Sequence, residues 1–100
     1  MLESKYQTEF LDKLRTIFAG CIILKNNASY LQGVPDWIIL YCNKWATLEI
    51  KRTICAHKQP NQAHYVNRMN NMSYSAFVYP ENEQQIILEL IEHFKGETQT

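Results

Sequence analysis

The stretch that most constrains this chain is residues 33–51, where two apolar runs lie on either side of a short polar break. Both runs are rich in β-branched and aromatic residues, and the break is Asn43-Lys44. This pattern is typical of a β-hairpin, because Asn tolerates the positive φ that tight turns require. Pro35 can begin a strand but cannot lie inside one. We therefore expect the first strand of the hairpin to start near Asp36.

The pairing of the two strands predicts which side chains share a face. A symmetric loop centred on Asn43-Lys44 places Cys42 opposite Trp45 and Asp36 opposite Lys51. Side chains alternate between the two faces along each strand. The polar face then contains Asp36, Ile38, Leu40, Cys42, Trp45, Thr47, Glu49 and Lys51, and the face expected to join the core contains Trp37, Ile39, Tyr41, Ala46, Leu48 and Ile50.

Three charged side chains, those of Asp36, Glu49 and Lys51, meet at one end of the polar face. Cβ atoms of directly opposite residues lie roughly 5 Å apart, and those of diagonal neighbours about 7–8 Å. Two carboxylates at such a separation repel each other unless a cation lies between them. The pattern predicts either a cation site or, in the simpler alternative, an edge hairpin with a solvated ion pair.

The motif formed by Pro35-Asp36 and, thirteen residues after Asp36, by Glu49-Ile50-Lys51 resembles the signature of the PD-(D/E)XK nucleases. Its context resembles the VRR-Nuc branch of that superfamily, especially the small stand-alone phage members. That context consists of Gln32-Gly33-Val34 before the first motif, Leu48 before the second, and Pro60-Asn61-Gln62 downstream. The resemblance covers residues 3–94. It implies an α/β fold with a restriction-endonuclease-like αβββαβ core, a mixed sheet flanked by helices, and an additional C-terminal helix.

The resemblance implies a Mg²⁺ site, with Mn²⁺ able to substitute. Asp36, Glu49 and the backbone carbonyl of Ile50 would be the protein ligands, and such hard oxygen ligands are those that Mg²⁺ prefers. Glu3, in the first expected helix, matches a position where this branch tends to have a further acid near the metal. As an alternative, Glu3 is a solvated helix acid.

The resemblance also implies catalytic roles for two further residues. Lys51 would orient the attacking water and offset the charge of the phosphate. Gln62 would lie beside the site and orient a carboxylate or a water, although a Gln in this position can equally be an ordinary polar helix residue. The implied activity is that of a Mg²⁺-dependent endodeoxyribonuclease, one that recognises a DNA structure such as a Holliday junction.

The whole chain fits a single domain, residues 1–100. Its 46% hydrophobic and 20% charged residues are a globular composition. The sequence has no apolar run near the ~20 residues of a membrane span and no signal peptide, so we expect a cytoplasmic protein, in the host cytoplasm if phage-encoded. We expect Cys21, Cys42 and Cys55 to be reduced packing residues. His57 and His64 lack the partners of a His-based nuclease motif, so we expect them at the surface or on DNA.

The distribution of charge is more informative than the net charge of zero, which argues against a passive nucleic-acid coat. No acidic residue lies between Glu49 and Glu81, whereas several basic ones do. The stretch between Glu49 and Glu81 is therefore a candidate for contacting phosphates. The alternative is that the acids are absent from it by chance. The expected DNA-binding residues are Lys25, Arg52, Lys58 and Arg68.

Apolar periodicity and turn residues predict the remaining elements. We expect a helix over residues 3–19, a strand over 21–25, a helix over 60–71, a strand over 75–79 and a last helix that Asn82 caps and Lys95-Gly96 ends. The tail from residue 97 is expected to fray.

The sequence is compatible with several functions. Within the enzyme class, the alternative to a structure-specific nuclease is a sequence-specific restriction enzyme. Outside that class, the chain could be a DNA-binding module that retains the fold without cleavage, or an interaction protein that uses the hairpin as an edge. Because cutting a four-way junction needs two coordinated sites, we expect a homodimer with twofold symmetry.

Overall fold

The structure, a computed structural model, describes residues 2–27 and 30–96. Along the chain the elements are α1 (Glu3–Ile17), β1 (Ile22–Lys25), β2 (Trp37–Tyr41), β3 (Lys44–Ile50), α2 (Pro60–Met72), β4 (Tyr74–Val78), a short 3₁₀ turn η1 (Pro80–Asn82) and α3 (Glu83–Lys95). All the expected helices and strands occur, with ends shifted by one or two residues. The tail expected to fray lies outside the described residues.

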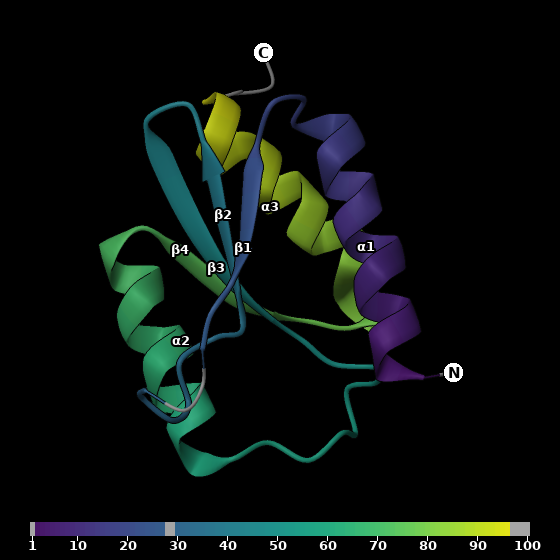
Figure 1. The fold of residues 1–100 in the computed structure, drawn as a ribbon, viewed down its shortest axis with the longest axis vertical. Coiled ribbons are helices and arrows are strands. Elements are labelled where there is room, and N and C mark those ends of the chain that lie inside the picture. The colour runs from purple at the N-terminus through teal and green to yellow at the C-terminus, as the bar shows by residue number, and fades with distance from the viewer. Residues whose placement is uncertain (1, 28–29, 97–100) are drawn as a thin grey trace.

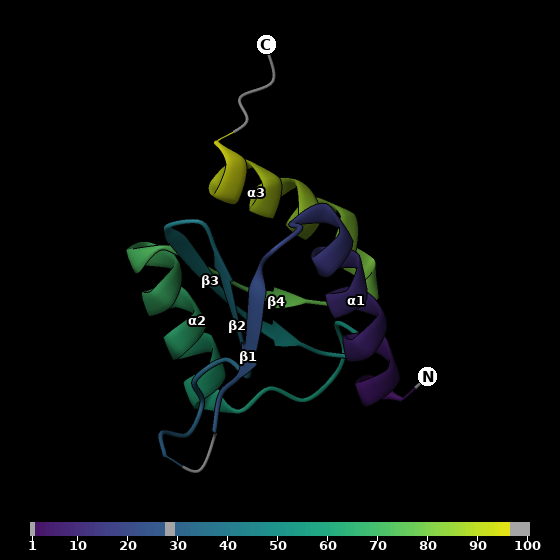
Figure 2. The same ribbon diagram turned by 45° about the horizontal axis from the view of Figure 1, so that its top comes forward.

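The four strands form one mixed sheet in the order β1-β2-β3-β4. β1 and β2 pair antiparallel, as do β2 and β3, whereas β4 lies parallel to β3. α1 and α3 cover one face of the sheet, and α2 covers the other (Figures 1 and 2). The predicted mixed α/β architecture is confirmed. The hairpin is not an edge element, because β3 is an inner strand buried from Ala46 to Ile50.

The core lies between the sheet and the α1/α3 layer. The predicted apolar face of the hairpin is confirmed, since Ile39, Ala46, Leu48 and Ile50 are all fully buried. α1 and α3 supply the opposing side chains from stripes at helical spacing: Tyr6, Phe10, Leu14, Ile86, Leu90 and Phe94. Burial of these side chains, at roughly 25 cal/mol per Å² of apolar surface, holds both helices to the sheet.

The register of the hairpin differs from the prediction. Tyr41 pairs with Lys44, so the turn is Cys42-Asn43. Cys42, rather than an Asn, takes the positive φ of +55°. The predicted turn, Asn43-Lys44, and the observed turn, Cys42-Asn43, both contain two residues, and a positive φ at the first turn position, here Cys42, matches the right-handed twist of the strands. The pairing differs from the prediction by two residues. Because side chains alternate between the faces with a period of two, each side chain still lies on its predicted face, but the predicted pairing of Asp36 with Lys51 is wrong.

Two smaller expectations are also wrong. Cys42 and Cys55 are exposed and not packed in the core, whereas Cys21 packs at the core margin. Asn82 does not cap α3 with its side chain. Its Oδ1 accepts from the Tyr79 amide at 2.8 Å, and its Nδ2 donates to the Phe77 carbonyl at 3.1 Å, so it fixes the turn that precedes α3.

The helices differ in how they end and in how deeply they are buried. α3 ends at Gly96, which takes the left-handed conformation with φ +63°, as the Lys95-Gly96 pair predicts. α2 begins at Pro60 as expected and has no fully buried residue, because it covers only part of its face of the sheet. No helix among residues 2–27 and 30–96 has the length and apolar character needed to cross a membrane.

Candidate active site

The site lies where β3 runs past the end of its neighbour β2. β2 begins at Trp37, which pairs with Leu48, so Asp36 lies one step beyond the last pair, at the position opposite Glu49. On the other side β4 continues, and the Lys51 amide donates to the Val78 carbonyl at 2.9 Å. The end of β3 therefore has a neighbouring strand on one side only, and Asp36 reaches Glu49 from the open side.

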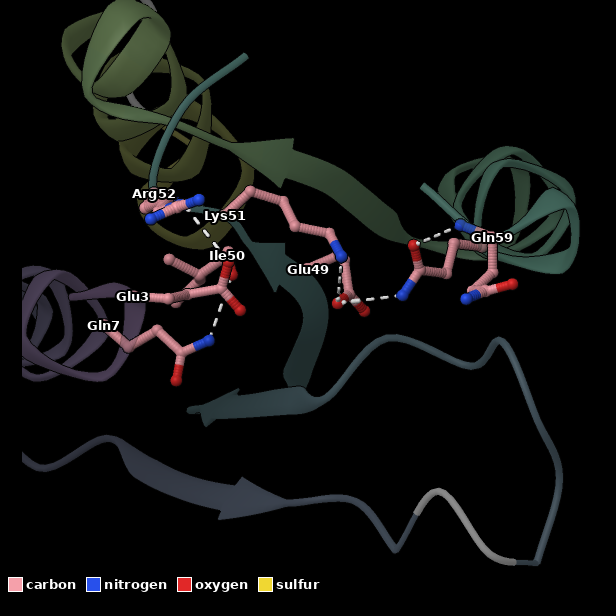
Figure 3. Close-up of polar contacts among 8 residues, drawn as sticks. Glu3, Gln7, Glu49, Ile50, Lys51, Arg52 and Gln59 are labelled. Atoms are coloured by element: carbon pink, nitrogen blue, oxygen red, sulfur yellow. Dashed lines mark hydrogen bonds and ion pairs between the residues drawn. The ribbon is translucent and has the colours of Figure 1, made fainter. Parts of the chain in front are cut away.

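Glu49 is the centre of the site. Its side chain is only 4% exposed, because it lies on the face of the sheet that α2 covers. Oε2 accepts from Gln62 Nε2 at 3.3 Å and lies 3.7 Å from Lys51 Nζ. Oε1 is equally buried but forms no hydrogen bond with the described part of the chain. Figure 3 shows this cluster between the first turns of α1 and α2.

Burial and neighbouring acids raise the pKa of Glu49 to about 7. Loss of hydration is the largest cause, and the negative charge of Asp36 comes next. The Lys51 ammonium and the Asp36 backbone amide oppose this rise of the pKa, while Glu3 adds a smaller contribution to it. The carboxylates of Asp36, Glu49 and Glu3 therefore repel one another, and the single ammonium of Lys51 does not neutralise their charge. A bound cation would relieve this repulsion.

Gln62 is fixed at both ends of its amide. It is the third residue of α2, and its Oε1 accepts from the Gln59 backbone amide at 3.0 Å in a capping box. Since Oε1 is used in this way, the Nε2 donor is directed to Glu49. Gln62 therefore lies beside Glu49, as predicted, and the capping box with Gln59 explains how α2 holds it there.

Two side chains of α1 contact the other side of the motif. Glu3 Oε1 accepts from the Arg52 amide at 3.3 Å, and Gln7 Nε2 donates to the Ile50 carbonyl at 3.0 Å (Figure 3). The sequence prediction included Glu3 but missed Gln7. A signal was present, because residues four apart on a helix share a face and Gln7 follows Glu3 by four.

The loop before Asp36 is docked on α2. Gly33 has φ +94°, and a Cβ at this position would lie 2.3 Å from the Cβ of Asn61 in the first turn of α2. The Asp36 carbonyl accepts from the Asn26 amide at 2.6 Å, just beyond the end of β1. The Asp36 backbone is therefore bonded to the residue that follows β1, and Gly33 allows the preceding loop to approach the helix that carries Gln62.

The expected basic residues have different environments. Lys51 is buried in the site, Arg52 is exposed beside it, and Arg68 is exposed on α2. Lys58 is half-buried, with Nζ 5.2 Å and 4.9 Å from the ring centroids of Phe77 and Tyr79, which contribute a cation–π attraction.

Lys25 lies apart from this group. It pairs with Trp37, on the face of the sheet opposite Glu49, and its Nζ lies 5.0 Å from the centroid of the Trp37 ring. The structure therefore brings Asp36, Glu49, Lys51, Gln62 and Glu3 together and leaves Lys25 outside the cluster.

The residues present fit a small divalent cation. The described chain contains no ready-made group of three His, Cys, Asp or Glu ligands. Mg²⁺, however, is usually held by one or two carboxylates together with waters and a substrate phosphate. The Glu49 Oε1 atom without a partner, the adjacent Asp36 and the Ile50 carbonyl are such hard donors, with Glu3 near them.

Comparisons with protein-family models, with curated proteins and with solved structures found no match to this chain. Both His57 and His64 are exposed, and neither belongs to the cluster around Glu49.

Proposed function

We propose that this chain is a Mg²⁺-dependent endodeoxyribonuclease with a restriction-endonuclease-like core. The observation that carries the proposal is the state of Glu49, a buried carboxylate next to Asp36. One of its oxygens contacts Gln62 and Lys51, and the other has no hydrogen-bond partner within the described part of the chain. Burying a charge costs much free energy unless it is compensated. A protein that needed only stability would gain by an apolar residue here, so the retained acid supports a ligand role.

Each residue has a task in phosphodiester hydrolysis. Asp36, Glu49 and the Ile50 carbonyl would hold the cation, while Gln62 fixes the orientation of Glu49. A bound divalent ion polarises the scissile phosphate and acidifies a water. The ammonium of Lys51, close to Glu49, can orient the attacking water and offset the phosphate charge as the P–O bond to the leaving oxygen breaks.

The preferred DNA is a branched structure, cut by a homodimer. Most of these 100 residues belong to the sheet and its helices, so few remain for base-reading loops within this domain, which favours recognition of DNA shape over sequence. β1 is an edge strand whose Ile22 and Leu24 are 55% and 46% exposed, a surface that a second copy can cover. Sedimentation of the wild type and of a Leu24→Lys variant tests the assembly, and a monomeric wild type, free and on DNA, would reject the dimer.

A cleavage panel tests the activity. Labelled linear, nicked, flapped and four-way DNA are incubated with the protein in Mg²⁺ and in EDTA, together with Glu49→Gln and a matched control, Glu92→Gln, in an exposed acid of α3. We expect cleavage by the wild type and the control in Mg²⁺ only, fastest on branched DNA, and none by Glu49→Gln. Binding of all four DNAs without any cleavage would instead identify a non-catalytic DNA-binding module.

A further inference from the structure

The side chain of Gln7 donates the hydrogen bond to Ile50 that a neighbouring β-strand would otherwise supply. Alternate residues of β3 direct their backbone groups to opposite neighbours, and Lys51 faces β4 through its bond to Val78. Ile50 and Arg52 therefore face the side of β2. β2 starts only at Trp37, level with Leu48, so it offers Ile50 and Arg52 no partner.

α1 supplies the missing partners with two side chains. Gln7 Nε2 donates to the Ile50 carbonyl at 3.0 Å, and Glu3 Oε1 accepts from the Arg52 amide at 3.3 Å. Buried backbone groups are almost always paired, so the contact with Gln7 satisfies the carbonyl of the fully buried Ile50, while the contact of Glu3 with the Arg52 amide is exposed. They also fix the direction of the Ile50 carbonyl, which lies between the two motif residues Glu49 and Lys51.

We propose that Gln7 is a positioning residue for the cation, acting through the Ile50 carbonyl; this inference rests on the proposed function. A carbonyl oxygen has two lone pairs, so it can accept from Gln7 and still face a cation with the other. The donated hydrogen bond holds the peptide plane in one orientation before the ion arrives. Partners of this kind, outside the ligand set, commonly change metal affinity by about 10–100-fold.

The experiment compares Gln7→Met with the wild type. Met keeps the length and helix propensity of Gln but donates no hydrogen bond. Gln84→Met is the matched control, an exposed Gln of α3 outside the site. Mn²⁺ affinity is measured on DNA-free protein from the electron paramagnetic resonance signal of free Mn²⁺, and melting temperature is recorded for each variant.

We expect Gln7→Met to weaken Mn²⁺ binding about tenfold, with Gln84→Met unchanged. In protein labelled at the Ile50 carbonyl carbon, the ¹³C signal should shift in Gln7→Met, and its response to Mg²⁺ should weaken. A loss of melting temperature with unchanged Mn²⁺ affinity and unchanged Mg²⁺ response would overturn the inference, because it would show a purely structural contact. If Gln7→Met does not fold, Gln7→Asn, which is one methylene too short to reach, gives the same test.

The failure of this inference is distinguishable from that of the proposed function. Mn²⁺ binding that depends on Asp36 and Gln7, in a protein that cuts no DNA, supports the role of Gln7 and rejects the nuclease. Mn²⁺ binding by the wild type that Gln7→Met leaves intact rejects the role of Gln7 only. A wild type that binds no Mn²⁺ overturns both.

Discussion

At the scale of single residues, Glu49 is subject to two opposing requirements. The stability of the fold favours its protonated form, whereas binding a cation requires its ionised form. Its pKa of about 7 means that the fold favours the protonated form. Because the folded-state pKa lies above the ordinary value of 4.5, the associated stability is fully present below that value and is lost as pH rises through 7. Above pH 7 the apoprotein retains a buried charge that Lys51 compensates only in part and that a bound cation would compensate further.

Glu49→Gln should therefore stabilise the metal-free protein at pH 8, since Gln resembles the protonated acid. A gain of about 1–2 kcal/mol in the free energy of unfolding is reasonable, because one pKa unit corresponds to about 1.4 kcal/mol. Denaturant unfolding at pH 8 and at pH 5 measures the effect, which should nearly vanish at pH 5. Glu92→Gln is the control. A variant less stable than the wild type at pH 8 would contradict the assigned burial cost.

The affinity for Mn²⁺ should rise with pH, whereas the stability of the metal-free protein falls. Cation binding requires the ionised form of Glu49, so each ion bound below pH 7 displaces about one proton. Affinity should rise nearly tenfold per pH unit up to about pH 7 and then level off. Titration calorimetry in buffers of different ionisation enthalpy measures the released protons. Binding that does not change between pH 5.5 and 8 would exclude Glu49 as a ligand.

The sequence predicted the residues of the site better than their contacts. The two faces of the hairpin followed from the alternation of side chains along each strand. A two-residue error in register therefore left Asp36 and Glu49 on the same face. The register itself was not predictable from residue types, because it depends on the positive φ of Cys42. Gln7 was missed because its partner is a backbone carbonyl, which becomes available only where β2 ends.

At the scale of elements, the loop before Asp36 and the first turn of α2 act as one unit. Gly33 lies against Asn61, and the next residue of α2 is the Gln62 that holds Glu49. The two motif acids thus depend on this contact for their separation. The sequence did not reveal this contact, since contacts between distant segments leave no local pattern.

Gly33→Ala should separate these elements and weaken cation binding by at least about tenfold, the scale seen when a supporting contact of a metal site is lost. The new Cβ would lie 2.3 Å from that of Asn61, in addition to the strain of φ +94°. Gly20→Ala is a matched control, because it has a similar φ of +89° and no atom within 4 Å of the added Cβ. Mn²⁺ affinity and melting temperature are measured for both. Equal affinity in the two variants would show that this contact does not position the site.

At the scale of the whole molecule, the candidate DNA surface consists of Arg52, beside the site, Lys58, just before α2, and Arg68, in α2. Arg52→Ala and Arg68→Ala should each reduce the slope of log K against log salt by about 0.9 if each contacts a duplex phosphate. Lys58→Ala should change the slope less, because its ammonium already packs on Phe77 and Tyr79. Arg15→Ala, in an exposed ion pair with Asp12 on α1, is the control. Slopes that all four variants leave unchanged would place the DNA surface elsewhere.

The most direct test of a metal-dependent nuclease is single-turnover cleavage of a four-way DNA junction by the wild type and by Asp36→Asn. Asn keeps the size of Asp but removes the charge that lies beside Glu49 and that the cation needs. We expect the wild type to cut in Mg²⁺ and to stop in EDTA, and Asp36→Asn to bind the junction without cutting it. Cleavage that persists in EDTA, or cleavage by Asp36→Asn at the wild-type rate, would contradict the proposed metal site.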